Sequence, residues 1–165
     1  MVADVLGFLT RFGRYDASVD GHASRRSVQM RTKPVLTSDD VNKMAAAAEA
    51  FAAANQWAVT VAIFDDGAHL LHLHRMDGAA PSTVEMAIGK GRTAALGRRE
   101  SKVYEDIVLQ GRISFLSVPL VGLVEGGVPI VVDGETVGAI GVSGVKSEQD
   151  AAVARAGIAA LTDAG

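Results

Sequence analysis

Three histidines lie close together in one predicted strand, and they are the first side chains of this chain that could do chemistry. Strand alternation over residues 68–75 places His72 and His74 on one face and His69 on the other. Two imidazoles at positions i and i+2 of a strand can reach one metal ion or one haem iron. His72 and His74 are therefore candidate metal ligands. The alternative is a purely structural pair on the wetter face of an edge strand.

Three further side chains could bind an anionic ligand. Arg75 follows the histidines at the end of the strand, and a guanidinium fork suits bidentate recognition of a carboxylate. Lys90 and Thr93 are three residues apart in a predicted helix and therefore share a face. The structural alternatives are a loop arginine that pairs with Asp77 and a solvent-exposed helix face.

A glycine-rich hairpin near the C-terminus is the strongest local pattern. Asp133-Gly134 between two β-branched runs predicts a tight turn, because both central positions need a positive φ. Gly126 and Gly127, followed by Pro129, can present backbone N–H groups to an anion. Glycine within a strand marks the close approach of another backbone or of a ligand. Such glycines recur at every third residue of the second strand, at Gly138, Gly141 and Gly144.

The composition excludes several classes of function. At 165 residues with a net charge of −3, the chain has the size of one domain and lacks the basic footprint of a nucleic-acid-binding protein. It contains no cysteine, which excludes disulfides, thiolate chemistry and cysteine-ligated metals. No apolar run approaches the length of a membrane span. The apolar stretch at residues 2–9 is interrupted by Asp4 and does not match a secretory signal, so we expect a cytoplasmic protein.

The remaining pattern predicts the elements that position these side chains. Thr37 to Asp40 form a helix start with capping groups, and the last helix begins with the same kind of signal at residues 147–150. The expected helices cover residues 37–55, 81–96, 101–110 and 147–161. The expected strands form one hairpin at 57–64 and 68–75, a second at the glycine-rich block, and a short strand within 113–123.

This order predicts a single-domain α+β fold in which helices flank an antiparallel sheet. Residues 30–165 would form the domain, and residues 1–29 an N-terminal extension. Apolar residues recur at helical spacing in that extension. They predict either a short helix that packs on a neighbouring subunit or a loosely held arm.

Four blocks of the sequence also resemble a known family, the GlcG/HbpS haem-degrading family, which is related to the C-terminal domain of PduO-type proteins. The resemblance extends over about residues 36–161 and is carried by residues 61–67, 75–79, 87–95 and 126–150. It implies a profilin-like sheet of about five antiparallel strands. It also implies a homo-oligomer that binds haem or a related tetrapyrrole, with haem degradation or iron sequestration as its role.

Two other functions remain open at this point. The chain could be an enzyme of a catabolic pathway that acts on a small organic acid or an aromatic catabolite. Arg75 and Lys90 would then bind the carboxylate, and His72 or His74 would act as acid or base. Alternatively, it could be an accessory protein that docks on a partner through residues 1–29.

Overall fold

The computed structural model describes residues 30–161, so the predicted extension at residues 1–29 lies outside the described part of the chain. Four α-helices, one 3-10 helix and four strands make up this part. In chain order they are α1 (Ser38–Ala54), β1 (Thr60–Asp65), β2 (Leu70–Arg75), α2 (Thr83–Gly97), α3 (Lys102–Leu109), η1 (Ile113–Ser117), β3 (Gly127–Val132), β4 (Glu135–Ser143) and α4 (Ser147–Ala159).

The start of α1 shows how directly the local sequence sets an element. The Thr37 hydroxyl accepts a hydrogen bond from the Asp40 backbone N–H at 3.2 Å, and the Asp40 carboxylate accepts one from the Thr37 N–H at 2.9 Å. This reciprocal capping box satisfies N–H groups that have no partner within the helix. The hydrogen bond from the Thr37 side chain, helped by the backbone bond, lowers the pKa of Asp40.

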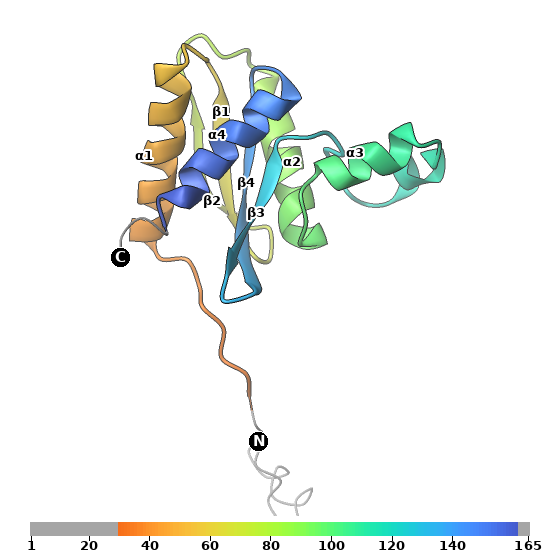
Figure 1. Cartoon of the computed structure of the whole chain (residues 1–165), viewed down its shortest axis with the longest axis horizontal. Coiled ribbons are helices and arrows are strands. Elements are labelled where there is room, and N and C mark those ends of the chain that lie inside the picture. Colours follow the sequence, from red (N-terminus) through yellow and green to blue (C-terminus); the bar gives the residue numbers. More distant parts are fainter. Residues whose placement is uncertain (1–29, 162–165) are drawn as a thin grey trace, which may run out of the picture. The chain divides into compact units, whose positions relative to one another are not determined.

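The four strands form one antiparallel sheet in the order β2-β1-β4-β3 (Figure 1). Both predicted hairpins are confirmed, and β1 pairs with β4 to join them at the centre of the sheet. Asp133 and Gly134 adopt φ values of 51° and 78° between β3 and β4, as the Asp-Gly signal requires. The predicted α+β class is confirmed.

The described residues form four strands, slightly fewer than the expected number of about five. The segment at 113–123 was expected to contain a short strand, but it forms η1 and an irregular stretch beside α3. Pro119 lacks a backbone N–H donor, and a strand interrupted in this way pairs poorly. The segment also packs on α3 and α2 rather than along a sheet edge.

Helices cover both faces of the sheet. The larger core lies between the sheet and the pair α1 and α4, which lie beside one another in Figure 1. The smaller core lies between the opposite face and α2, and it is built around Phe64 and small side chains such as Ala62 and Ala139. Small residues let α2 approach β4 closely, and Gly141 faces the backbone of Ala87 and Gly91.

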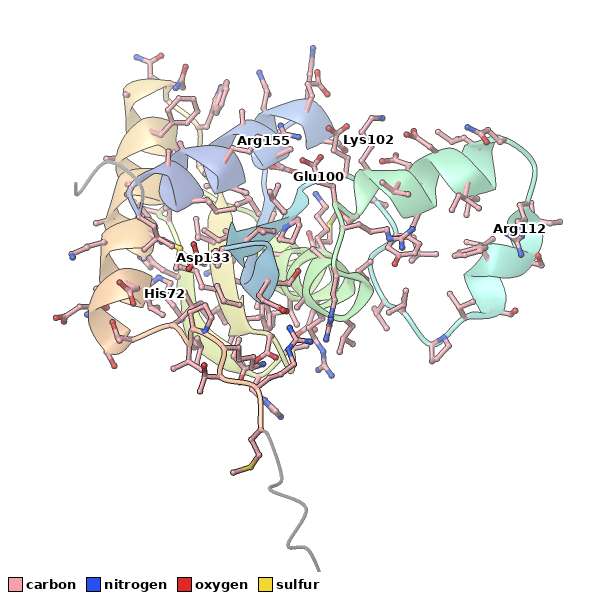
Figure 2. The ribbon with its side chains drawn as sticks, turned by 60° about the horizontal axis from the view of Figure 1, so that its bottom comes forward. His72, Glu100, Lys102, Arg112, Asp133 and Arg155 are labelled. Atoms are coloured by element: carbon pink, nitrogen blue, oxygen red, sulfur yellow. The ribbon has the colours of Figure 1, made fainter. Side chains whose placement is uncertain are left out.

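Residues 102–124, here called the α3 arm, extend away from the sheet (Figures 1 and 2). Its own interior is held by Tyr104 and Phe115, whose ring centroids are 5.9 Å apart. Its base is fixed by the Ser101 hydroxyl, which donates to the Val124 carbonyl at 2.7 Å, and by Glu105, which accepts from the Glu125 N–H at 2.7 Å. The arm is therefore an ordered projection that belongs to the domain.

Candidate functional site

The predicted pair His72 and His74 lies on the sheet face that α1 covers. The register of the β1–β2 ladder sets them opposite Ile63 and Val61, both of which belong to the larger core. There they meet Glu49 of α1. His74 Nδ1 lies 2.9 Å from Glu49 Oε1, and His72 Nε2 lies 3.5 Å from the same oxygen.

The two imidazoles differ in their access to solvent. The His74 side chain is 51% exposed, whereas that of His72 is 26% exposed. The His72 Nε2 atom is buried and lacks a hydrogen-bond partner. The Nδ1 atom of His74 faces the Glu49 carboxylate at ion-pair distance. The other ring nitrogen, Nε2, is not engaged in this contact.

Arg75 does not join this cluster. It is the next residue of β2, so its side chain leaves the opposite face of the strand, and it is exposed. Its ladder partner is Thr60, whose hydroxyl lies 2.7 Å from that of Thr83 at the start of α2. Arg75 therefore belongs to the α2 side of the sheet.

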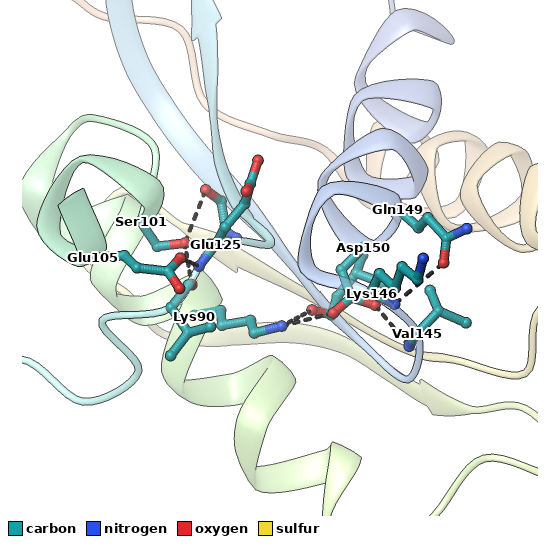
Figure 3. A network of polar contacts seen from close by, with 11 residues as sticks. Lys90, Ser101, Glu105, Glu125, Val145, Lys146, Gln149 and Asp150 are labelled. Carbon is teal, nitrogen blue, oxygen red and sulfur yellow. Dashed lines mark hydrogen bonds and ion pairs between the residues drawn. The ribbon is translucent and has the colours of Figure 1, made fainter. Parts of the chain in front are cut away.

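Lys90 lies in the interior, where it forms an ion pair. Its side chain is 3% exposed, and its ammonium donates to Asp150 Oδ2 at 2.7 Å and to the Val142 carbonyl at 3.1 Å. Figure 3 shows the amine of Lys90 reaching from α2 to the first turn of α4, where Asp150 lies. The second carboxylate oxygen, Asp150 Oδ1, accepts from the Val145 N–H at 3.1 Å. This ion pair links two helices that pack on opposite faces of the sheet.

Burial raises the pKa of Asp150. The Lys90 ammonium opposes this effect through its hydrogen bond and its charge, as do the N–H groups of Val145 and Gly144. The carboxylate thus depends on Lys90 to remain charged in the interior. The network has the character of a structural tie between α2 and α4.

Gly126 and Gly127 lie directly against Lys90. A Cβ atom on Gly127 would overlap the Lys90 carbonyl, and one on Gly126 would lie 2.9 Å from the Lys90 Nζ. The Gly127 N–H already donates to the Ser101 hydroxyl at 2.9 Å, and the Gly126 carbonyl accepts from the Val142 N–H at 2.9 Å. Close packing thus accounts for both glycines. Pro129 lies apart from them in β3, opposite Ala139.

Thr93 is fully buried, and its hydroxyl donates to the Val121 carbonyl at 2.7 Å. It lines a cavity of about 280 Å³ between α2 and residues 119–121. A second, more apolar hollow of about 500 Å³ lies on the other side of Val121, within the α3 arm. The predicted site residues are thus distributed over several places. Only His72 with His74, and Lys90 with the two glycines, are brought together.

Two partners in these clusters escape prediction from the sequence. Glu49 comes from α1, 23 positions before His72, and Asp150 comes 60 positions after Lys90. No spacing rule connects residues so far apart. In the sequence, Asp150 is recognisable only as an acidic residue in the first turn of a helix. Glu49 is recognisable only as an acidic residue beside the buried face of α1.

Within residues 30–161, no three His, Cys, Asp or Glu side chains stand in an arrangement that could hold a metal ion by themselves. Glu49, His72 and His74 converge without completing such a site.

In the same part of the chain, no helix combines the length and the apolar character that crossing a membrane requires.

Comparison with known proteins gives a consistent result. The family model "Haem degrading protein HbpS-like" matches residues 36–159. The Escherichia coli K12 protein GlcG is 49% identical over 114 residues, which cover 69% of this chain and 85% of GlcG. An uncharacterized 15.0 kDa Citrobacter freundii protein from the dhaT-dhaS intergenic region is 30% identical, with 70% of this chain and 84% of that protein covered.

Solved structures agree with these relatives. A double mutant of HbpS from Streptomyces reticuli superposes with a TM-score of 0.74 at 29% identity, covering 86% of this chain and 97% of that one. A PduOC–haem complex superposes with a TM-score of 0.69 at 30% identity, covering 77% of this chain and 95% of that one. The chain therefore belongs to the HbpS-like haem-degrading family.

Proposed function

We propose that this protein binds haem or a related tetrapyrrole, whose iron His74 would ligate. Membership of the HbpS-like family and the haem complex of PduOC support this proposal. The family's description as haem-degrading supports breakdown of the bound haem as a further role. Sequestration of its iron is the alternative role that we propose. The site is placed at the edge of the sheet formed by β2, where His74 is accessible.

The observation that carries the proposal is the contact between His74 and Glu49. Histidines that bind a metal commonly donate their other ring N–H to a carboxylate, which fixes the tautomer and makes the ligating nitrogen more basic. His74 Nδ1 is 2.9 Å from Glu49 Oε1, and no described residue bonds to the His74 Nε2. The Glu49 carboxylate beside Nδ1 would thus leave Nε2 of the half-exposed His74 ring for the iron.

A porphyrin also fits the lack of a complete metal site among the described residues. The macrocycle itself would provide most of the ligands of the iron, so the protein would need to add few. One exposed imidazole is sufficient for that task, although it could not hold a bare ion. His72 Nε2 is buried 3.5 Å from the same carboxylate oxygen and has no hydrogen-bond partner.

A haemin titration followed by absorption spectroscopy tests this proposal. The wild-type protein is expected to give a saturable shift of the Soret band, and His74→Ala to lose that shift. Glu49→Gln should weaken haemin binding by about 10–100-fold, because it removes the charge that makes His74 a stronger ligand. His69→Ala is the matched control, since His69 pairs with Asp65 rather than with this cluster. An unchanged titration for His74→Ala would exclude His74 as the ligand.

We further propose that the protein forms a homo-oligomer through the α3 arm. Four of its apolar side chains, Leu109, Ile113, Leu116 and Val121, are 66–77% exposed. They stand beside the hollow of about 500 Å³, whose lining is almost entirely apolar. In a symmetric dimer the same patch of both copies meets, so that patch must be complementary to itself. The α3 arm meets this requirement, because it carries both projecting side chains and a hollow that could receive them. An apolar patch of this kind commonly marks a protein–protein contact.

Sedimentation equilibrium checks the oligomer. The wild-type protein is expected at a multiple of the 17.1 kDa chain mass, and Leu109→Lys/Leu116→Lys at or near that mass. Met86→Lys provides the control, because Met86 is exposed on α2 outside the arm. Circular dichroism verifies that each variant is folded. A monomeric wild-type protein, or an oligomer that the double variant leaves intact, would contradict this interface.

A further inference from the structure

The outer face of α2 and residues 119–121 enclose a cavity of about 280 Å³ that the proposed haem site does not use. Four of its lining residues, Glu85, Ile88, Arg92 and Leu96, follow one another at intervals of three or four and therefore form one stripe along the helix. Pro119, Leu120 and Val121 form the opposite wall. Clefts that bind small molecules usually measure about 300–1,000 Å³, so this one suits a small ligand.

Both walls of the cavity are held in place. The Thr93 hydroxyl donates to the Val121 carbonyl at 2.7 Å and ties residues 119–121 to α2. Gly89 and Gly122 allow the two backbones to touch, since a Cβ atom on Gly122 would overlap the backbone of Gly89 and Lys90. The space between the walls is therefore part of the folded structure.

Arg92 provides the chemical specificity of the cavity. It is exposed, and no described residue forms a hydrogen bond or ion pair with its guanidinium. Apart from Arg92 and Glu85, the lining consists of Ile, Leu, Val and Pro side chains with Gly89 and the already bonded Thr93. A guanidinium at an apolar wall is suited to a ligand that has an apolar body and one carboxylate.

Glu85 restricts that ligand further. It precedes Arg92 by seven residues, which is about two helical turns or roughly 10 Å along α2. A second carboxylate at the far end of a ligand bound to Arg92 would approach Glu85, and like charges repel. A dicarboxylate of that length should therefore bind less favourably in this cavity than a monocarboxylate.

We propose that the cavity between α2 and residues 119–121 binds a small apolar monocarboxylate whose carboxylate pairs with Arg92. The site lies on the opposite face of the sheet from His74, because α2 covers one face and α1 the other. It is therefore separate from the proposed haem site, and the two proposals can fail independently.

Amide NMR spectra of the full chain test the proposal with hexanoate as the probe. Hexanoate is expected to shift the amides of residues 85–96 and 119–121 in a saturable way. Hexanamide, which lacks the charge, and adipate, which adds a second carboxylate, should bind at least tenfold more weakly. Arg92→Gln should lose at least tenfold in hexanoate affinity, and Arg92→Lys should lose less because it retains the charge.

Arg98→Gln is the matched control, since Arg98 is an exposed arginine that follows α2 and does not line the cavity. Its hexanoate affinity should remain within twofold of wild type. Haemin binding by Arg92→Gln should be unchanged, and hexanoate binding by His74→Ala likewise. The spectra themselves report whether each variant is folded. Equal affinity for hexanoate and hexanamide, no shifts with hexanoate, or full affinity in Arg92→Gln would each overturn the proposal.

Discussion

Replacement of Lys90 by methionine is expected to lower the free energy of unfolding by about 3–5 kcal/mol, because it leaves a buried carboxylate without its partner. Asp150 is 1% exposed, and the Lys90 ammonium is its only cationic partner among the described residues. The methionine side chain fills a similar volume, so a cavity contributes little to the loss. Urea denaturation at pH 7 measures the effect.

The pH dependence of Lys90→Met gives the same hypothesis a second test. Burial raises the pKa of Asp150, and removal of Lys90 eliminates the main influence that opposes it. In this variant the Asp150 carboxyl binds a proton more readily in the folded state than in the unfolded chain, where its pKa is about 4. The free energy of unfolding therefore rises as the pH falls from the Asp150 pKa of the folded state toward that of the unfolded chain. The deficit relative to wild type should therefore be largest at neutral pH and smaller in mild acid.

Asp150→Asn and the double variant Lys90→Met/Asp150→Asn complete a double-mutant cycle. Asparagine keeps an oxygen that can accept from the Val145 N–H, so the cycle isolates the ion pair. The double variant should be more stable than Lys90→Met, since no uncompensated charge remains. If Lys90→Met were as stable as wild type and instead lost haemin affinity, Lys90 would be a ligand-binding residue rather than a structural one.

Local signals in the sequence determine most of the elements of this fold. Thr37 and Asp40 start α1, and Asp133 and Gly134 form the turn between β3 and β4. Two strand-like runs on either side of residues 65–67 mark β1 and β2. Each signal acts within a few residues, so it can be recognised without a partner. Residues 113–123 show the limit of this approach. Their apolar composition is that of a strand, but no sheet edge accepts them, and Pro119 prevents a regular ladder.

The candidate site was less predictable, because tertiary contacts decide what each polar side chain does. Lys90 and Thr93 share a helix face as expected, and that face turns inward, where Asp150 and the Val121 carbonyl satisfy them. His72 and His74 were recognised from strand alternation alone. Their relation to Glu49 depends on the packing of α1 on the sheet, which no local pattern specifies.

Replacement of Gly141 by alanine is expected to cost about 3 kcal/mol or more, at or above the upper end of the usual penalty for overpacking. A Cβ atom at this position would overlap the Ala87 carbonyl and the Gly91 N–H, both of which belong to the backbone of α2. A flexible side chain could rotate away from the new methyl group, but a helix backbone cannot. Helix α2 would have to move off the sheet, and urea denaturation would record the loss.

Gly67→Ala is the matched control for this prediction. Gly67 also lacks a positive φ, and a Cβ atom there would lie 2.9 Å from the ring of His69. The His69 side chain is 80% exposed and can rotate away by giving up its surface contact with Asp65. The cost of Gly67→Ala should stay within about 1 kcal/mol, close to that of ordinary surface substitutions.

Because Lys90 precedes Gly91 in α2, displacement of the helix by Gly141→Ala should also weaken the ion pair between Lys90 and Asp150. Lys90→Met should therefore cost less in the Gly141→Ala background than in wild type, whereas additive losses would show that α2 stays in place.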